Sequence, residues 1–144
     1  MDQYKFIKAE NAGDLERFFP VMKELRTNLS FDNFLNTYEK AHLHDGYEIL
    51  GVEAENKIIA VMGYRILYDF VHGKHIYIDD LVTTEKFRSR GIGALFLKHA
   101  EKIAKDHNCS GLRLCTGVEN ESGKKFYESQ QWKMRAVVYK KKIG

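Results

Sequence analysis

Apolar residues recur at helical spacing between Gly91 and His107, with lysine and glutamate residues on the opposite side. The apolar stripe consists of Ile92, Leu95, Phe96, His99, Ala100, Ile103 and Ala104. The pattern of polar and apolar residues also predicts helices at about Ala12 to Arg26, Ser30 to His42 and Asn120 to Ser129. Ser30 stands where an N-terminal capping residue of the second helix is expected.

Other stretches are rich in β-branched and aromatic residues, which favour strands. Tyr47 to Ala54 and Lys57 to Tyr68 are separated only by Glu55-Asn56, so we expect an antiparallel hairpin there. Further strands are predicted at Tyr4 to Ala9, Lys74 to Thr83, Leu112 to Cys115 and Trp132 to Lys142. The strand–helix–strand order after residue 74 places the Leu112 strand parallel to the Lys74 strand. The sequence therefore predicts a mixed α/β sheet.

Composition and charge suit one ordered domain covering residues 1–144. The chain has 44% hydrophobic and 30% charged residues, and no repeat or low-complexity linker interrupts it. Its formal net charge of +3 is far from the basic surface of a nucleic-acid-binding protein, so no nucleic-acid partner is expected. No stretch approaches the roughly 20 apolar residues that span a bilayer. We therefore expect no membrane partner and a cytoplasmic location.

A short segment with two glycines, Arg88-Ser89-Arg90-Gly91-Ile92-Gly93, joins the Lys74 strand to the long helix. Glycines allow close approach to the main chain, and the free N–H groups at a helix N-terminus favour an anion such as phosphate. Glycine at a helix start is equally an ordinary turn feature. No Gly-Lys-Ser/Thr follows, which excludes a P-loop, and Phe96 stands where a dinucleotide fingerprint has its third glycine.

The pattern Arg88-x-x-Gly91-x-Gly93 after a strand resembles the pyrophosphate-binding motif Arg/Gln-x-x-Gly-x-Gly/Ala of the GNAT family of N-acetyltransferases. The order of predicted elements resembles that fold over nearly the whole chain. The resemblance implies a mostly antiparallel central sheet flanked by helices, with a parallel strand pair splayed around an acetyl-CoA site. It also implies that the loop holds the pyrophosphate and that the end of the preceding strand runs beside the pantetheine. The cofactor-binding residues expected on this basis are Leu81, Val82, Thr83, Arg88, Ser89, Arg90, Gly91, Ile92, Gly93 and Ala94.

A later segment, Asn120-Glu121-Ser122-Gly123-Lys124-Lys125-Phe126-Tyr127, resembles the second motif of that family, Asn-x-x-Ala-x-x-Phe-Tyr, with Gly123 in place of the usual alanine. Asn120 is placed like a helix-capping residue. The resemblance implies that Asn120 also contacts the pantetheine arm and that Phe126 packs beside it. It makes Tyr127 the expected catalytic acid for the departing thiolate, although Tyr127 taken alone would be a half-buried aromatic residue.

An amine acceptor must lose a proton before it attacks a thioester, because a lysine-like amine has a pKa of about 10.4. Asp79 is the expected catalytic base, by resemblance to family members with an acidic pair at this point, and Asp80 follows it directly. Strand alternation points these two side chains to opposite faces unless a bulge intervenes, so only one is expected to face the acceptor. Both could instead be features of the fold or bind a cationic substrate. His75 or a chain of water molecules could also relay the proton.

The sequence thus predicts an N-acetyltransferase that moves an acetyl group from acetyl-CoA to a primary amine of a small molecule or peptide. The alternative is a non-catalytic acyl-CoA-binding regulatory module. No metal is expected, because the histidines lack HExxH or Cys/His spacing. The end strand from Trp132 offers an edge for a homodimer. The acceptor is expected to be selected by the two early helices and the loop Tyr68 to Gly73.

Overall fold

The computed structural model describes residues 3–144 and divides into two compact units, Met1–Arg113 and Leu114–Gly144. The elements of the first unit are β1 (Lys5–Lys8), α1 (Ala12–Leu25), α2 (Phe31–Asp45), β2 (Glu48–Ala54), β3 (Lys57–Asp69), β4 (Gly73–Thr83), the short 3₁₀ helix η1 (Glu85–Phe87), α3 (Ile92–Asp106) and β5 (Gly111–Leu114). The last residue of β5 already belongs to the second unit, which contains α4 (Glu121–Ser129). All the predicted helices are present. Organisation as one domain stays a prediction.

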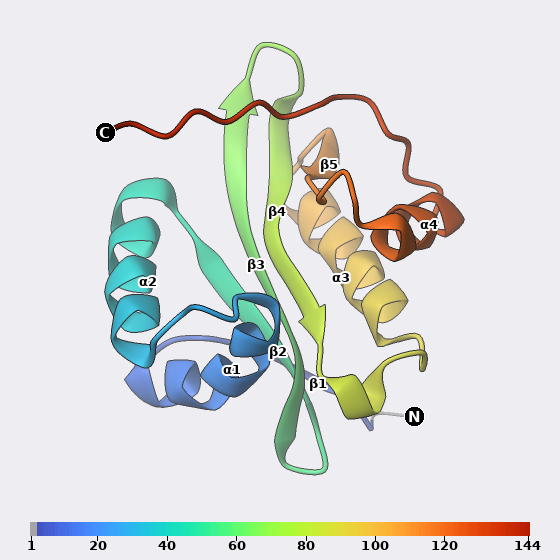
Figure 1. The fold of residues 1–144 in the computed structure, drawn as a ribbon. Helices are drawn as coiled ribbons and strands as arrows, with labels where there is room; N and C mark the ends of the chain where they lie inside the picture. The colour runs from blue at the N-terminus through green and yellow to red at the C-terminus, as the bar shows by residue number, and fades with distance from the viewer. Residues whose placement is uncertain (1–2) are drawn as a thin grey trace. The chain divides into compact units, whose positions relative to one another are not determined.

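The strands form a five-stranded sheet in the order β1-β2-β3-β4-β5 (Figure 1). The pairs from β1 to β4 are antiparallel, and β5 lies parallel to β4. This confirms the predicted mixed, mostly antiparallel sheet. The β2–β3 hairpin turns at Glu55 and Asn56, whose φ angles of 52° and 64° are the two positive values that a type I′ turn requires.

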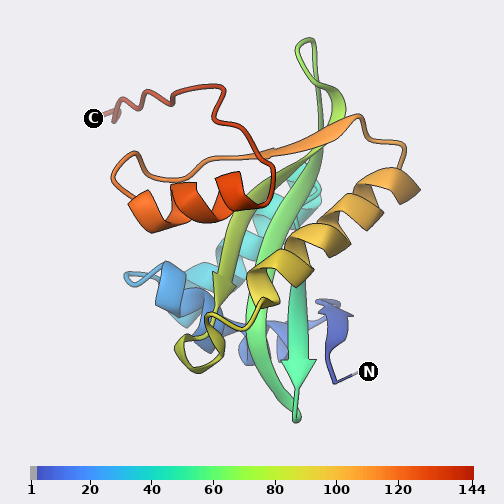
Figure 2. The same ribbon diagram turned by 90° about the vertical axis from the view of Figure 1, so that its right-hand side faces the viewer.

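Helices cover both faces of this sheet, as two perpendicular views show (Figures 1 and 2). Neighbouring residues of β1 reveal the two layers, because side chains alternate across a strand. Phe6 packs edge-on against Phe96 of α3, with ring centroids 5.6 Å apart. Ile7 packs instead against the cluster that contains Phe18 of α1 and Phe34 of α2. The sheet is therefore held between α1 and α2 on one face and α3 on the other.

Capping residues determine where α1 and α2, the two helices that line the pocket described below, begin or end. Asn11 caps α1 by accepting a hydrogen bond from the Asp14 N–H at 2.9 Å. Ser30 caps α2 by accepting one from the Asn33 N–H at 3.1 Å, as predicted. Gly46 ends α2 in the left-handed conformation with φ 67°, where a side chain would be strained. Each end is thus set by nearby sequence.

The predicted strand from Trp132 to Lys142 is wrong, because the structure describes these residues without regular secondary structure. Their sequence has the right residue types, but a strand also needs a hydrogen-bonding neighbour. In residues 114–144 the structure describes no strand beyond Leu114 at the end of β5. The apolar side chains of Met134, Val137 and Tyr139 are accordingly exposed.

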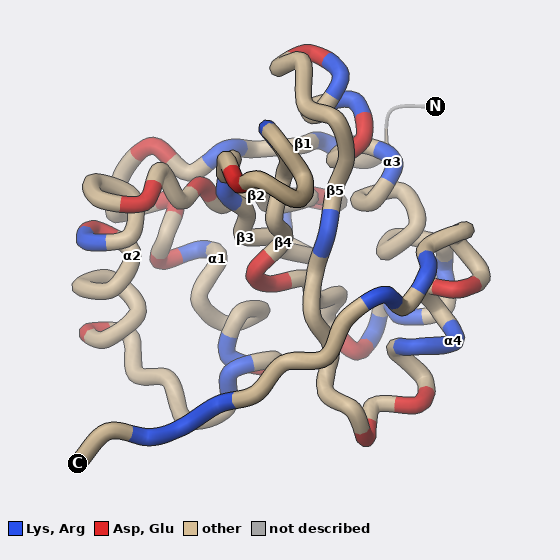
Figure 3. Tube along the Cα trace, turned by 90° about the horizontal axis from the view of Figure 1, so that it is seen from above, with Lys and Arg blue, Asp and Glu red and all other residues tan. Residues whose placement is uncertain are grey.

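Charged residues of both signs are mixed along α1, α2 and α3 (Figure 3). After Glu128, the charged residues of the sequence are all lysine or arginine. No helix described between residues 3 and 144 combines the length and the apolar character that crossing a membrane requires.

Candidate active site

The loop between β4 and α3 has the backbone of an anion site. Ser89 and Gly91 both have positive φ, 64° and 80°, so the chain folds back tightly before the helix begins. Gly91 is the N-cap of α3, and no side chain caps this end. The first N–H groups of the helix, at Ile92, Gly93 and Ala94, therefore lack a side-chain cap, and they carry the partial positive charge of a helix N-terminus. This arrangement fits a phosphate group.

The two arginines of the loop are placed differently. Arg88 turns back toward β4: its Nε donates to the Thr83 carbonyl at 2.9 Å and its Nη2 lies 3.2 Å from Glu24 of α1. Glu24 also accepts from the Thr84 hydroxyl and the Glu85 N–H, so it ties the start of the loop to α1. Arg90 is exposed and stacks on Phe87, 4.8 Å from the ring centroid. Glu24 was not foreseen as part of the site.

The end of β4 is paired along one edge only. Leu81, Val82 and Thr83 pair with β3, opposite Met62, Val61 and Ala60. On the other side β5 has only four residues against eleven in β4. The Ser110 N–H donates to the Lys74 carbonyl at 2.8 Å, so the parallel pairing begins at the start of β4. With four residues β5 cannot pair with the whole length of β4, and Leu81, Val82 and Thr83 have β3 as their partner strand among the described residues.

A β-bulge in β4 changes the direction of the acidic pair. Gly63 of β3 pairs with Asp80, but the next residue, Tyr64, pairs with Ile78, so Asp79 is the extra residue in β4. Both Asp79 and Asp80 line the same pocket. The expectation that only one of them would face this side is wrong, because the bulge overrides strand alternation.

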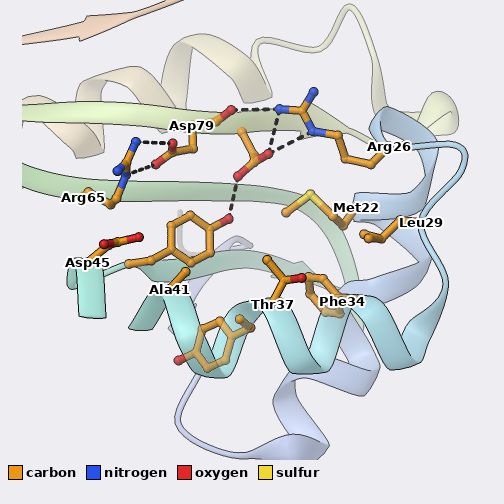
Figure 4. Close-up of a pocket in the computed structure, with 12 residues that line it drawn as sticks. Met22, Arg26, Leu29, Phe34, Thr37, Ala41, Asp45, Arg65 and Asp79 are labelled. Atoms are coloured by element: carbon orange, nitrogen blue, oxygen red, sulfur yellow. Dashed lines mark hydrogen bonds and ion pairs between the residues drawn. The ribbon is translucent and has the colours of Figure 1, made fainter. Parts of the chain in front are cut away.

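This pocket lies between α1, α2 and the sheet and has a volume of about 450 Å³ (Figure 4). The side formed by α1, α2 and their connection is mostly apolar but includes Arg26 and Asp45, whereas β3 and β4 contribute charged side chains. Its lining is Met22, Arg26, Leu29, Phe34, Thr37, Tyr38, Ala41, Asp45, Tyr47, Arg65, Asp79 and Asp80. The two early helices contribute as expected, whereas the loop Tyr68 to Gly73 provides none of these residues.

Asp79 is held by Arg65 through two parallel hydrogen bonds, Nε to Oδ2 at 2.9 Å and Nη2 to Oδ1 at 2.8 Å. Burial raises the pKa of Asp79 above its ordinary value, although the bonds from Arg65 act in the opposite direction. Asp79 is thus a carboxylate with increased proton affinity at the wall of a small pocket.

Asp80 has a separate set of partners. Arg26 donates to its Oδ1 from Nε at 3.0 Å and from Nη2 at 2.8 Å, and the Tyr47 hydroxyl donates to its Oδ2 at 2.5 Å. Burial and the neighbouring Asp80 raise the pKa of Tyr47 well above its ordinary value, so this phenol stays a donor. Neither Arg26 nor Tyr47 was foreseen, because nothing in their local sequence marks them.

The second unit contains the other motif. Asn120 caps α4 by accepting from the Gly123 N–H at 3.1 Å, and its amide donates to the Thr116 hydroxyl at 2.8 Å. A Cβ at position 123 would overlap the amide nitrogen of Asn120, so glycine lets this amide lie close to the start of α4. Phe126 and Trp132 lie against Tyr127, with ring centroids 5.1 and 5.9 Å away. Burial raises the pKa of Tyr127, so its phenol is protonated through neutral pH.

One further cluster contains the kinds of residue that bind metals. Ligand atoms of Asp69, His72 and His75 lie within 4.8 Å of one another. Nδ1 of His75 lies 2.9 Å from the Gly73 carbonyl, which can only accept, so Nδ1 carries the proton. The remaining acceptor, Nε2, receives a hydrogen bond from Arg113 Nε at 2.9 Å. A metal ion there would have to displace Arg113, and the expectation of no metal stays a prediction.

Comparison with known proteins agrees with this geometry. The family model described as Acetyltransferase (GNAT) family matches residues 13–131. The uncharacterized N-acetyltransferase YhdJ of Bacillus subtilis (strain 168) is 29% identical over 109 residues, which are 76% of this chain and 77% of that protein. The thialysine N-epsilon-acetyltransferase of Bos taurus is 25% identical and covers 88% and 82% of the two chains. The aminoglycoside N-acetyltransferase AAC(6')-Iy in complex with CoA shares the fold, with a TM-score of 0.82, 18% identity and coverage of 97% and 95%.

The family match over residues 13–131, together with the fold, makes the protein an acetyltransferase. The chain belongs to the GNAT family of acetyltransferases. It is an N-acetyltransferase, and acetyl-CoA is its acetyl donor.

Proposed function

We propose that the acceptor is a primary amine of a small molecule, or of a peptide, that enters the pocket between α1, α2 and β4. The observation that carries this proposal is Asp79, a carboxylate of increased proton affinity that lines a pocket of about 450 Å³. That volume suits a small ligand. The names of related proteins support the same class, since they include thialysine and aminoglycoside acetyltransferases and a spermidine/spermine N(1)-acetyltransferase-like protein.

The residues divide the reaction between donor and acceptor. The ammonium group gives its proton to Asp79, directly or through water, and the free amine attacks the thioester carbonyl carbon. A C–N bond forms and the C–S bond breaks, and Tyr127 transfers its phenolic proton to the leaving thiolate. The acetylated nitrogen loses its remaining extra proton through water, which restores the Tyr127 phenol, and Asp79 releases its proton to solvent. A main-chain N–H near Val82 or Thr83 stabilises the negative oxygen of the tetrahedral intermediate. The products are the acetylated amine and coenzyme A.

On the donor side, the loop Arg88 to Ala94 holds the pyrophosphate, and Leu81 to Thr83 run beside the pantetheine. The uncapped N-terminus of α3 and the one-sided pairing of β4 support these two roles. Asn120 and Phe126 complete the pantetheine contacts in this proposal. A homodimer is also proposed, on the basis of the exposed apolar residues Met134, Val137 and Val138. The cytoplasmic location stays a prediction from the sequence.

The role of Asp79 is tested by replacing it with asparagine, which keeps its size but cannot accept the proton. We expect Asp79→Asn to lower kcat with a usable amine about 100-fold or more. Asp45→Asn is the matched control, because Asp45 lines the same pocket without a hydrogen bond or ion pair in the described part of the chain. It should change turnover only a few-fold. Equal losses in both variants would remove Asp79 from its assigned role.

A further inference from the structure

The acidic pair in the pocket consists of two carboxylates with different surroundings. Within residues 3–144, Arg65 is the one side chain that hydrogen-bonds the Asp79 carboxylate, and it engages both oxygens. Both oxygens of Asp80 are engaged, one by Arg26 and the other by Tyr47. The Asp80 side chain is thus held by residues from two other segments of the chain, whereas the Asp79 side chain is held by β3.

We propose that Arg26, Tyr47 and Gly63 are positioning residues that hold Asp80 as a fixed anion beside Asp79. The charge of Asp80 adds to the effect of burial on the proton affinity of Asp79, against the opposing charges of Arg65 and Arg26. The inference rests on the proposed role of Asp79 as proton acceptor. It gives a positioning role to three residues that contribute no group to the reaction itself.

Arg26 supports the bulge as well as the carboxylate. It is the C-cap residue of α1, and its Nη2 reaches both Asp80 Oδ1 at 2.8 Å and the Asp79 carbonyl oxygen at 2.9 Å. One guanidinium therefore bonds the main chain of Asp79 and the side chain of Asp80. This contact connects the end of α1 to the bulge in β4 and fixes where the two carboxylates lie.

Gly63 makes room for the contact between Tyr47 and Asp80. A Cβ at this position would overlap the Tyr47 hydroxyl oxygen and lie 2.6 Å from Asp80 Oδ2. Gly63 is also the residue of β3 that pairs with Asp80. Any side chain here would push the donor away from its acceptor, so glycine is needed for packing at this point.

The charges facing Asp79 come from several elements. Arg65 of β3 and Arg26 at the end of α1 favour its ionised form, whereas Asp80 opposes it. Asp45 at the end of α2 is a further carboxylate of the pocket. Tyr47 stays neutral and is bonded to Asp80. A neighbouring negative charge makes a second one less favourable, so Asp80 increases the proton affinity of Asp79.

Two substitutions should move the proton affinity of Asp79 in opposite directions. Asp80→Asn removes the anion and leaves Arg26 uncompensated. The pH midpoint of the acid limb of the kcat/KM profile should therefore move to lower pH by about half a unit or more. Arg26→Met removes the cation and should move the limb up by a similar amount. Arg26→Lys keeps the charge and should restore the limb toward its wild-type position. Arg17→Met is the control, because Arg17 also lies on α1 but pairs with Glu53.

A second readout keeps this proposal separate from the proposed function. The Asp79 carboxyl group of the protein alone, labelled with ¹³C, is titrated by NMR in the same variants and in Tyr47→Phe, which loses only the donor to Asp80. Opposite shifts for Asp80→Asn and Arg26→Met support the proposal even if no tested amine is acetylated. Shifts in the same direction, or no shift with the fold retained, would overturn it and leave the acetyltransferase function standing.

Discussion

The donor loop and the acceptor pocket of the first unit are built in different ways. The loop from Arg88 to Ala94 is a short continuous segment that offers mainly main-chain N–H groups. The pocket instead brings together side chains from α1, α2, β3 and β4, and residues as distant in sequence as Arg26 and Asp80 form direct bonds. A main-chain site tolerates variation in its side chains, whereas a side-chain site depends on each one. We therefore expect substitutions in the two regions to behave differently.

The largest effect should come from placing a negative charge in the donor loop. Gly91→Asp brings a carboxylate to the uncapped helix start, and we expect coenzyme A binding to weaken roughly 100-fold or more, as for an unpaired like charge at a binding site. Calorimetry measures this loss.

Gly91→Asn is the matched control, because asparagine has the same shape without the charge and tolerates positive φ better than most residues. Nothing lies within 4 Å of a Cβ built at Gly91, so steric overlap does not contribute. Asparagine should retain most of the affinity. If both variants lose binding equally, backbone strain rather than electrostatics governs the loop.

Tyr127→Phe should leave coenzyme A binding intact and lower kcat by about 100-fold, because the thiolate loses its proton donor. Tyr139→Phe, which alters an exposed phenol in the same unit, is the control. Full turnover by Tyr127→Phe would exclude the assigned acid.

The pH dependence of the wild-type enzyme distinguishes the role of Asp79 from that of Tyr127. Asp79 must be ionised to accept a proton, and burial raises its pKa, so activity should rise with pH at a point above the ordinary range of an aspartate. Tyr127 must be protonated to donate, and burial raises its pKa too, so activity should fall only at strongly alkaline pH. A profile in which Asp79→Asn keeps the acid limb would assign that limb to another group.

The smallest effects should come from the arginine side chains of the loop. Arg90→Met removes an exposed cation, and we expect affinity for coenzyme A to fall about two- to fivefold, more at low salt than at high salt. Arg88→Met should do less, because the charge of Arg88 is already balanced by Glu24. Losses comparable to that of Gly91→Asp would mean that side chains, and not the main chain, hold the phosphates.

The difference between a local segment and a pocket built from distant side chains also explains which features could be predicted from the sequence. The Ser30 and Asn120 helix caps and the hairpin turn at Glu55-Asn56 depend on residues close together in the chain, and they were predicted correctly. The loop from Arg88 to Ala94 is equally local, and its binding of the donor stays a prediction. The bulge at Asp79 depends on the register between β3 and β4, so it was foreseen only as an exception to strand alternation.

The partners of the acidic pair could not be predicted at all. The bonds from Arg26 and Tyr47 to Asp80 join segments that only the folded chain brings together. The strand expected after Trp132 failed for a related reason, because residue types favour a strand but a neighbouring strand must complete it.

The central claim is that the donor loop and the acceptor pocket together transfer an acetyl group to an amine. The most direct measurement incubates the protein with acetyl-CoA and a panel of small primary amines, including thialysine, lysine, spermidine and an aminoglycoside, and follows products by mass spectrometry. We predict one equivalent of N-acetylated amine for each coenzyme A released, and loss of both in Gly91→Asp. Tight binding of acetyl-CoA with no acetylated amine across the panel would contradict the claim and favour a non-catalytic acyl-CoA-binding module.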